Sequence, residues 1–461
     1  MEHTTLDALA RACGAECPEA GRDMVITGVS TDSRTVGAGD LFVPLTGERF
    51  DGHDFLQAAA ERGASAALCS RPEAACGMPV LEVADTLRAL QAIAADYRCR
   101  LPMRIVGITG SVGKTSTKEM VWSVLSQRFE TGKTQGNLNN EIGVPLTVLS
   151  FTGSQAAGVV EMGMNHFGEM SRLTAVAQPD VAVVTNIGIN HIEYLGSREG
   201  IARAKLEILE GLRPGGTLIV SGDEPLLREV RGERFRTWRF GVENRDCEFF
   251  CREVTVAGES QRVVFATPQG ELRATIPCLG GHHVKNALAA AAVGLCYGLT
   301  LEEIGRGIAA FQTTGRRQRT VQVGPFTVVD DCYNASPDSM RAAFSVLSQM
   351  DRAGKYAALG GMLELGDHAP QAHRDIGQAA AELFGGLALY GENAEYYREG
   401  ALEAGMDPGR AVVCQSHGEA AELLRSWLRP GDVVLLKGSR RMRMEEVLRL
   451  LIVSEDGGEV Q

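Results

Sequence analysis

The fold of this chain is decided by the stretch Gly107-Ile-Thr-Gly-Ser-Val-Gly-Lys-Thr-Ser116, a glycine-rich turn between two periodic segments. The residues before the turn, Met103–Ile108, read as a short buried strand. After it, the segment Thr115–Gln127 places apolar side chains on one helical face. In a strand, glycine loop and helix arranged in this order, backbone N–H groups and the helix N-terminus can hold an anionic phosphate. We therefore interpret the stretch as a phosphate-binding loop, or P-loop.

Two side chains of this loop have specific expected roles. Lys114 would neutralise the outer phosphates of a nucleotide, and the Thr115 hydroxyl would bind Mg²⁺. The common loop carries a glycine where this chain has Ile108, so the pattern does not match an ordinary GTPase or motor ATPase. Taken alone, the stretch could also be a glycine-rich corner with a solvated lysine. The expected nucleotide-binding residues are Gly107, Thr109, Gly110, Ser111, Val112, Gly113, Lys114, Thr115 and Ser116.

Composition limits the class of protein. A chain of 461 residues is too long for one ordinary domain and suits about three. The formal net charge of −12 argues against a general nucleic-acid or membrane-surface binder, so local lysines and arginines must hold any anionic substrate. The 11 cysteines lack zinc-type spacing, and the first residues lack the basic flank and apolar core of a signal peptide. These features predict a cytoplasmic protein with reduced thiols.

Alternating strand and helix patterns predict an α/β fold of three domains. Residues 1–100 form a small α/β unit, with a strand over Asp40–Leu45 and a helix over Asp54–Arg62. Residues 101–313 hold the P-loop and a mostly parallel sheet, with strands at 157–161, 180–185 and 216–220 and an antiparallel insert over 247–279. Residues 314–461 form a Rossmann-like domain without a dinucleotide fingerprint, with strands at 327–329, 356–359, 387–390, 411–414 and 432–436.

Three side chains of the central segment could bind metal ions. Glu161 ends an apolar strand, which is where a nucleotide-bound Mg²⁺ is usually held, although a lone strand-end charge facing water is simpler. His191 follows the next strand, and Lys205 lies on a helix with apolar neighbours. A lysine in apolar surroundings has a depressed pKa, and its neutral amine can take up CO₂. The carbamate would be an oxygen ligand for a second Mg²⁺. A structural histidine and a solvated lysine are the alternatives.

Polar groups at other positions also point to a nucleotide. Asn286 stands at the mouth of an alanine-rich helix, and Arg316-Arg317 lies at the boundary of the second and third domains. Asp331 follows the first strand of the third domain, where a ribose-binding aspartate is more common than an acid–base pair. In the first domain, loops over 31–34 and 46–55 are rich in donors and glycine, which suits a sugar nucleotide or ordinary turns equally.

Five further stretches stand in a fixed order along the chain: Gly136-Asn-Leu-Asn-Asn-Glu-Ile-Gly143, Glu161-Met-Gly-Met-Asn-His-Phe-Gly-Glu169, Asp331-Cys-Tyr-Asn-Ala-Ser-Pro-Asp338, Met362-Leu-Glu-Leu-Gly366 and Lys437-Gly-Ser-Arg440. With the P-loop, this combination resembles the Mur ligases, the ATP-dependent amide-forming enzymes of peptidoglycan precursor synthesis. The resemblance covers essentially the whole chain, in the same three-domain order. It implies a small UDP-binding domain, a central ATP-binding domain and a C-terminal Rossmann-like domain.

The resemblance also implies residue roles. Lys114, His191 and Lys205 match catalytic positions, Thr115 and Glu161 match ligands of a first Mg²⁺, and His191 and carbamylated Lys205 match ligands of a second. Asn286 matches an adenine contact, and Arg316 and Asp331 match contacts to phosphate and ribose, with Arg317 an alternative to Arg316. The positions that match UDP-substrate contacts are Ser33, Arg34, Thr46, Gly47, Asp51, Gly52, His53, Asn137 and Asn140.

Within that family, two features narrow the expected reaction. The chain has Tyr333-Asn-Ala-Ser-Pro337 and lacks the Asp-Asn-Pro-Arg stretch of the ligases that add diaminopimelate or lysine. The resemblance therefore implies a bacterial cytoplasmic monomer that uses ATP and two Mg²⁺ to add D-Ala-D-Ala to UDP-MurNAc-tripeptide through an acyl phosphate. The alternatives are a tripeptide-forming or folylpolyglutamate synthase-like amide ligase of the same fold, or a nucleotide-gated regulatory protein. No nucleic acid or membrane partner is expected.

Overall fold

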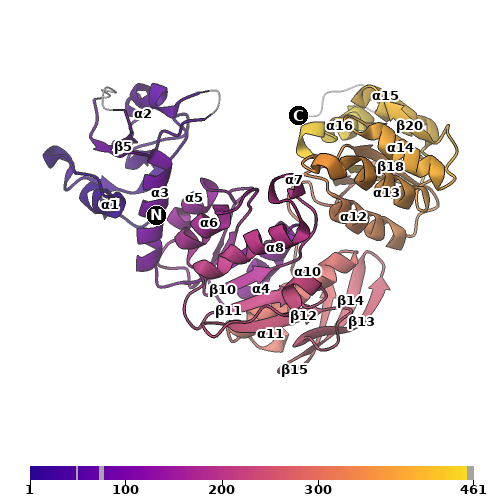
Figure 1. The fold of residues 1–461 in the computed structure, drawn as a ribbon, viewed down its shortest axis with the longest axis horizontal. Coiled ribbons are helices and arrows are strands. Elements are labelled where there is room, and N and C mark those ends of the chain that lie inside the picture. Colours follow the sequence, from indigo (N-terminus) through magenta and orange to yellow (C-terminus); the bar gives the residue numbers. More distant parts are fainter. Residues whose placement is uncertain (48–49, 72–76, 454–461) are drawn as a thin grey trace.

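The computed structural model describes residues 1–47, 50–71 and 77–453. In this part of the chain the strands form four sheets. Figure 1 shows the N-terminal segment and the C-terminal segment as two separate lobes above a central body, which carries the longest sheet. No helix within the described ranges is both long and apolar enough to cross a membrane.

The N-terminal lobe is small. A short antiparallel pair lies beside a parallel four-stranded sheet in the order β3-β4-β5-β6. The strand predicted over Asp40–Leu45 ends at Phe42, because Pro44 has no N–H for the ladder. The helix predicted over Asp54–Arg62 begins as a 3₁₀ turn, whose first residues are capped by the Asp51 side chain. The elements are β1 (Thr4–Thr5), α1 (Leu6–Cys13), β2 (Val25–Ile26), β3 (Gly28–Ser30), β4 (Asp40–Phe42), η2 (Gly52–Phe55), α2 (Leu56–Glu61), β5 (Ala66–Cys69), β6 (Val80–Glu82) and α3 (Thr86–Arg100).

The central body is built on a nine-stranded sheet in the order β15-β14-β13-β12-β11-β10-β7-β9-β8. Its middle strands are parallel, so the carboxyl ends of β7, β9 and β10 meet at one edge. The predicted antiparallel strands are confirmed, and they extend this same sheet through β12, a strand that the sequence did not predict. The strands are β7 (Arg104–Thr109), β8 (Thr131–Lys133), β9 (Ala157–Glu161), β10 (Val181–Val184), β11 (Thr217–Ser221), β12 (Arg236–Gly241), β13 (Phe249–Ala257), β14 (Ser260–Thr267) and β15 (Gly270–Ile276).

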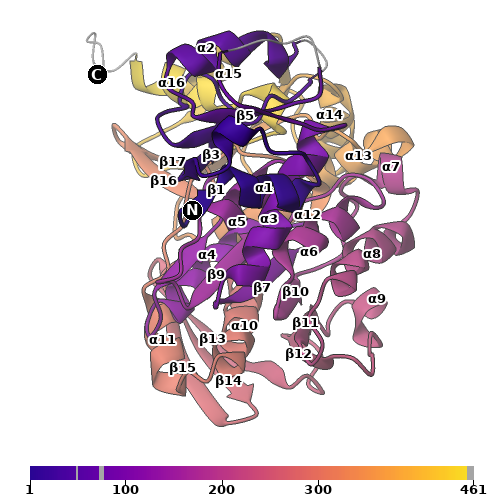
Figure 2. The ribbon, with the colours of Figure 1, turned by 90° about the vertical axis from the view of Figure 1, so that its left-hand side faces the viewer.

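Helices cover both faces of this sheet, and each face has its own apolar core. Alternate residues of a strand point to opposite faces, so Val181 and Val183 pack in one cluster while Ala182 and Val184 pack in the other. The first cluster includes α4 (Lys114–Leu125), α10 (Gly281–Cys296) and α11 (Leu301–Ala309). The second includes α3, α5 (Gly143–Ser150), α6 (Glu169–Ala177) and α8 (Arg198–Leu206), and continues into the N-terminal lobe. Figure 2 shows α3 running between that lobe and the central body.

The C-terminal lobe has a six-stranded sheet in the order β16-β17-β21-β18-β19-β20. The five predicted strands are confirmed and pair in parallel, while β16 joins antiparallel at one edge. The sequence did not predict β16 because Arg319–Val323 is largely polar and exposed. The elements are β16 (Arg319–Val323), β17 (Phe326–Asp331), α12 (Pro337–Gln349), β18 (Lys355–Gly360), α13 (Ala369–Ala381), β19 (Leu387–Tyr390), α14 (Ala394–Glu403), β20 (Ala411–Cys414), α15 (His417–Trp427), β21 (Val433–Lys437) and α16 (Glu445–Val453).

Candidate active site

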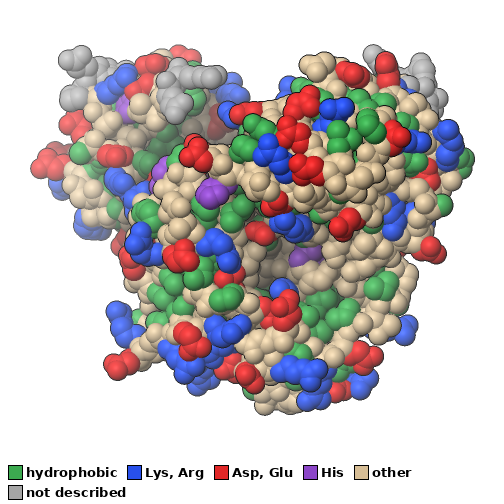
Figure 3. Space-filling model, turned by 45° about the vertical axis from the view of Figure 1, so that its right-hand side comes forward, with side chains coloured by type: hydrophobic (Ala, Val, Ile, Leu, Met, Phe, Trp, Pro, Cys, Tyr) green, Lys and Arg blue, Asp and Glu red, His purple; other side chains and the backbone are tan. Residues whose placement is uncertain are grey.

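A cavity of about 450 Å³ lies where the carboxyl ends of β7, β9 and β10 face the C-terminal lobe. We call it the cleft cavity. Its walls come from the P-loop, the loops after β9 and β10, the first turn of α10, the linker before β16, and residues at the ends of β17 and β21. The space-filling view in Figure 3 shows the surface hollowed between the lobes. Ligands of α/β proteins commonly bind at this edge of a parallel sheet.

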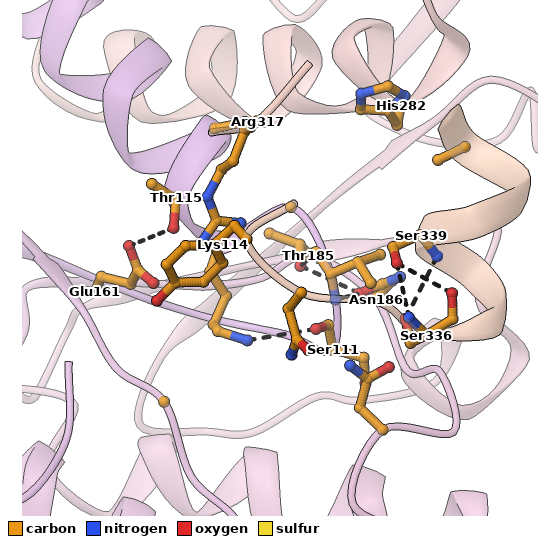
Figure 4. Close-up of a pocket in the computed structure, with 18 of the residues that line it drawn as sticks. Ser111, Lys114, Thr115, Glu161, Thr185, Asn186, His282, Arg317, Ser336 and Ser339 are labelled. Carbon is orange, nitrogen blue, oxygen red and sulfur yellow. Dashed lines mark hydrogen bonds between the residues drawn. The ribbon is translucent and has the colours of Figure 1, made fainter. Parts of the chain in front are cut away.

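The P-loop has the conformation that its glycines allow. Gly110 has φ +148°, and a Cβ there would stand 1.9 Å from the Thr185 hydroxyl. Thr185 Oγ1 donates a hydrogen bond to the Val112 carbonyl (2.7 Å), and Asn186 Oδ1 accepts one from the Val112 N–H (3.0 Å). The loop after β10 therefore holds the P-loop in place (Figure 4). The place of Thr185 and Asn186 after a parallel strand was the one sequence feature that could have indicated this role.

The nucleotide-binding residues predicted for the P-loop divide into two groups. Gly107 and Thr109 lie inside β7, and neither they nor Gly110 line the cleft cavity. For Gly107 the structure gives a packing reason, since a Cβ there would stand 2.5 Å from the Met162 side chain. The predicted residues that do line the cavity are Ser111, Val112, Gly113, Lys114, Thr115 and Ser116.

Lys114 is the first residue of α4 and carries its charge at the floor of the cavity. Its Nζ donates hydrogen bonds to the carbonyls of Gly110 (2.7 Å) and Ser111 (3.4 Å). Burial lowers the pKa of Lys114 to about 8, while the charge of Glu161 acts in the opposite direction. The ammonium form is therefore still the main one at neutral pH. It lies at a helix N-terminus, which itself favours anions.

Thr115 and Glu161 bring two oxygen donors together. Thr115 Oγ1 donates to Glu161 Oε2 (2.9 Å), and Asn139 Nδ2 donates to Glu161 Oε1 (2.8 Å). Oxygen donors suit Mg²⁺, which usually takes one or two protein ligands together with water and phosphate oxygens. The described residues contain no cluster of three or more His, Cys, Asp or Glu side chains placed to hold a metal. The pair therefore fits a nucleotide-bound Mg²⁺ rather than a metal caged by protein alone.

His191 and Lys205, the two residues expected at a second metal, lie in different settings. His191 lines the cleft cavity at the start of α7 (Ile192–Leu195), and its Nδ1 stands 2.6 Å from Glu364 Oε2 of the C-terminal lobe. Lys205 is buried on α8 and does not line the cavity. Burial, and then the charge of Lys114, lowers the pKa of Lys205 well below its ordinary value. A neutral amine is the form that reacts with CO₂, so this setting fits the predicted carbamate.

The first turn of α10 presents polar atoms to the cavity. Asn286 Oδ1 accepts a hydrogen bond from the Thr117 hydroxyl (3.0 Å). The Asn286 Nδ2 and the Nδ1 atoms of His282 and His283 are buried without a hydrogen-bond partner in the described part of the chain. All three side chains line the cavity, so these atoms are available to a ligand. Asn286 was predicted from the sequence as a nucleotide contact, but His282 and His283 were not. Their position one turn before Asn286 on the same helix could have indicated them.

The C-terminal lobe adds charged groups on the opposite wall. Asp331 is buried and accepts a hydrogen bond from Lys437 Nζ (2.6 Å), and burial raises the pKa of this carboxyl group. Arg317 lines the cavity, with its guanidinium 4.0 Å from the centre of the Tyr333 ring. Arg316 does not line the cavity and pairs with Glu445 (2.9 Å). Of the two arginines, the structure therefore brings Arg317 to the cavity, against the expectation placed on Arg316.

The positions expected to bind the UDP-linked substrate lie in two places. Asn140 lines the cleft cavity, and Asn137 lines a neighbouring cavity of about 910 Å³ between the central body and the C-terminal lobe. The others lie in the N-terminal lobe, on loops and at the start of η2, and line neither of these cavities: Ser33, Arg34, Thr46, Gly47, Asp51, Gly52 and His53. There, Arg34 pairs with Asp32 (2.7 Å), and Asp51 Oδ1 lies 2.6 Å from His53 Nδ1.

Comparison with known families accounts for nearly the whole chain. Residues 25–98 match the catalytic domain of the Mur ligase family, residues 108–294 match the Mur ligase middle domain, and residues 315–440 match the Mur ligase glutamate ligase domain. The chain belongs to the Mur ligase family. In this Mur ligase, most residues that line the cleft cavity belong to the middle domain (108–294) or to the glutamate ligase domain (315–440).

Relatives of this Mur ligase are similar over their full length. The UDP-N-acetylmuramoyl-tripeptide–D-alanyl-D-alanine ligase of Bacillus subtilis is 39% identical over 93% of this chain and 94% of the relative. The enzyme of the same name from Escherichia coli is 36% identical over 94% of this chain and 95% of the relative. A crystal structure of MurF from Acinetobacter baumannii superposes with a TM-score of 0.90 at 34% identity, over 98% and 99% of the two chains. MurF from Thermotoga maritima, solved in complex with ADP, has a TM-score of 0.83 at 28% identity, over 92% of this chain and 96% of that chain.

Proposed function

We propose that this Mur ligase joins D-Ala-D-Ala to UDP-MurNAc-tripeptide, with conversion of ATP to ADP and phosphate. A relative that carries the name of this activity is 39% identical over 93% of this chain. The observation that carries the proposal is the cleft cavity. In it, Lys114 of the P-loop faces the same space as Arg317 and Lys437 of the C-terminal lobe. Cations on both walls suit a reaction in which two anions must meet.

ATP is proposed to lie in the cleft cavity with its phosphates on the P-loop. The N–H groups at the start of α4 and the Lys114 ammonium would hold the phosphates, and Asn286 and His282 would contact the base. Arg317 and Asp331 would contact the nucleotide from the other wall. A first Mg²⁺ would be held by Thr115 Oγ1 and Glu161, and its charge would offset that of the phosphates. His191 and carbamylated Lys205 are the proposed ligands of a second Mg²⁺.

The reaction proceeds in two steps in this proposal. A carboxylate oxygen of the tripeptide attacks the γ-phosphorus, the bond to the β-phosphate oxygen breaks, and ADP leaves an acyl phosphate behind. The amine of D-Ala-D-Ala then attacks the acyl carbon, phosphate leaves with the bridging oxygen, and the nitrogen loses its proton to solvent. Lys114 and Arg317 lower the barrier because they stand where negative charge concentrates.

We assign D-Ala-D-Ala and the UDP-linked substrate to different parts of the molecule. The cavity of about 910 Å³ carries Arg440 and Arg441 of the C-terminal lobe, which suit the carboxylate of D-Ala-D-Ala. The UDP group is proposed to bind the loops of the N-terminal lobe that hold Arg34 and His53, with Asn137 and Asn140 nearer the reacting end. An acyl phosphate hydrolyses in water, so the lobes are proposed to close before chemistry. We further propose domain boundaries at 1–100, 101–313 and 314–461, and a cytoplasmic monomer.

The experiment that tests this function measures product and ADP together. The purified chain is mixed with ATP, Mg²⁺, UDP-MurNAc-tripeptide and D-Ala-D-Ala, and products are followed by mass spectrometry. We expect equal amounts of ADP and of a product heavier by one dipeptide less water, with neither formed when one acceptor is left out. ADP release that ignores both acceptors would indicate a nucleotide-gated protein. Amide formation with L-lysine, diaminopimelate or glutamate instead of the dipeptide would indicate another ligase of this fold.

A further inference from the structure

Gln318 occupies an unusual position in the linker between the central body and the C-terminal lobe. It immediately precedes β16 and has φ +54°, a left-handed conformation that residues other than glycine and asparagine adopt rarely. Its side chain lines the cleft cavity, and the residue also lines a separate cavity of about 580 Å³ next to the linker. Such a conformation persists only where surrounding contacts hold it.

The side chain of Gln318 is bonded to the central body. Its Oε1 lies 3.1 Å from Nε2 of His283, which is buried on the first turn of α10 against the Phe311 ring. The Gln318 side chain also hydrogen-bonds the neighbouring His282. Burial lowers the pKa of His283 to about 4, so the imidazole is neutral at physiological pH and has a single N–H. Because the facing amide oxygen can only accept, that proton lies on Nε2, and His283 donates to Gln318.

The backbone around Gln318 is bonded to the C-terminal lobe. The Gln318 N–H interacts with the carboxylate of Asp331, which Lys437 holds from the other side at 2.6 Å. The preceding residue, Arg317, lies over the Tyr333 ring at 4.0 Å and lines the cleft cavity. A single residue thus connects α10 of the central body to β17 of the C-terminal lobe, next to the arginine that faces the nucleotide site.

We infer that Gln318 is a positioning residue, whose hydrogen bond to His283 holds Arg317 and Asp331 where they can contact the nucleotide bound on the P-loop. This inference rests on the proposed ATP-dependent function. It assigns to the Gln318–His283 pair an effect on ATP rather than on the dipeptide, because the pair borders the cleft cavity and does not line the cavity proposed for D-Ala-D-Ala.

These contacts suggest variants that break the Gln318–His283 hydrogen bond without unfolding the protein. Gln318→Asn keeps an amide, the backbone N–H and a residue that tolerates positive φ, but its side chain is one methylene too short to reach His283. His283→Leu removes the donor at similar volume, and His283→Gln places an amide donor near the position of Nε2. The nearby bond from the Gly280 N–H to Gln349 Oε1 (3.1 Å) remains in all of them, so the lobes stay connected. Gln312→Ala, at an exposed glutamine of the same linker, is the matched control.

The measurement is steady-state kinetics with ATP and D-Ala-D-Ala varied separately, together with the thermal midpoint of each variant. Gln318→Asn and His283→Leu should each raise KM for ATP about two- to tenfold, the range for one hydrogen bond, and leave KM for D-Ala-D-Ala unchanged. The double variant should be no worse than Gln318→Asn alone, because Gln318→Asn already removes the bond that His283→Leu breaks. His283→Gln should recover most of the loss, and Gln312→Ala should behave like the wild type.

Three outcomes would overturn the inference. They are an unchanged KM for ATP in an active enzyme, additive effects in the double variant, or a fall in thermal midpoint with equal changes for both substrates. If the wild type forms no amide at all, the proposed function fails instead. ADP binding by calorimetry then tests the pair on its own, with weaker binding expected in Gln318→Asn but not in Gln312→Ala. Equal ADP affinity in those two variants would contradict the inference.

Discussion

Thr115 and Glu161 meet at the carboxyl ends of neighbouring parallel strands, where the threonine hydroxyl donates to the glutamate carboxylate over 2.9 Å. Thr115 follows β7 through the P-loop and Glu161 ends β9, so the register of β7 against β9 sets this distance. Asn139 holds the other carboxylate oxygen at 2.8 Å. The pair is thus oriented by contacts that exist before any ligand binds, as expected for a site that must hold a metal in a fixed place.

Replacing Glu161 with glutamine should weaken Mg²⁺ binding while keeping the fold. The amide oxygen can still accept the Thr115 hydrogen bond, and Lys118, which lies 3.7 Å from Glu161, keeps its partner Glu119 at 3.1 Å. Loss of the ligand charge should raise the Mg²⁺ concentration for half-maximal activity at least about tenfold. A magnesium titration of activity measures this shift, with Thr115→Ser, which keeps the hydroxyl, as control. An unchanged titration in Glu161→Gln would remove the residue from the metal site.

Lys114→Ala should abolish ADP release and amide formation together. The ammonium lies at the start of α4, where charge develops during phosphoryl transfer, and losing one such donor typically costs a hundredfold or more, about 10²–10³ in kcat. Lys355→Ala, at a lysine of the C-terminal lobe whose Nζ donates a hydrogen bond to the Ser348 carbonyl (3.3 Å), is the control for loss of a positive charge. Retention of wild-type turnover by Lys114→Ala would refute the assignment.

Gly110→Ala should disable the P-loop, because an added Cβ would stand 1.9 Å from Thr185 Oγ1 and the backbone has φ +148°. The Thr185 bond to Val112 would have to break, which should lower ADP affinity about five- to a hundredfold, as expected for strain of about 1–3 kcal/mol. Calorimetric titration with ADP gives the affinity. Gly37→Ala, where a Cβ meets no atom within 4 Å, should bind like the wild type. Equal affinities for both variants would show that the loop tolerates the side chain.

Acid should destabilise the C-terminal lobe through His373. This buried ring accepts a hydrogen bond from the Met362 N–H (3.0 Å), and burial lowers its pKa to about 4 from an ordinary value near 6.5. Between those values the unfolded chain binds the proton and the folded chain does not, so stability falls as pH drops from about 6.5 to 4. At about 1.4 kcal/mol for each pKa unit, the loss reaches a few kcal/mol.

Denaturant unfolding of the wild type and of His373→Gln at pH 7 and pH 5 measures this effect. The glutamine amide can still accept from Met362 but does not titrate, so its stability should change less between the two pH values. Parallel pH dependences in the two proteins would assign the acid sensitivity to other groups.

The sequence predicted those features that depend on local pattern. The strand before the P-loop and the helix after it were predicted because apolar periodicity and glycine spacing are local properties, and the structure has them as β7 and α4. β12 and β16 were missed because both are short runs in which arginine, threonine and glutamine separate a few apolar residues, a composition that also suits a loop. Lys437 was visible only as part of a motif at the end of a buried strand.

Other features depend on contacts that no local pattern records. The choice between Arg316 and Arg317 is set by which side chain meets Glu445 and which meets Tyr333, and those partners are distant in sequence. Likewise, the burial of His283 and its bond to Gln318 depend on how the linker crosses α10. The composition of the linker, with two arginines before a glutamine, indicated a charged boundary but not which residue connects the two lobes.

The proposed reaction depends on the cations on both walls of the cleft cavity, which let a carboxylate attack ATP. The experiment uses UDP-MurNAc-tripeptide in which both oxygens of the terminal carboxylate are ¹⁸O, incubated with ATP, Mg²⁺ and D-Ala-D-Ala. If an acyl phosphate forms, the phosphate released by the amine retains the bridging oxygen, so it should contain one ¹⁸O for each amide made. Phosphate free of ¹⁸O, released alongside normal amounts of amide, would contradict the account.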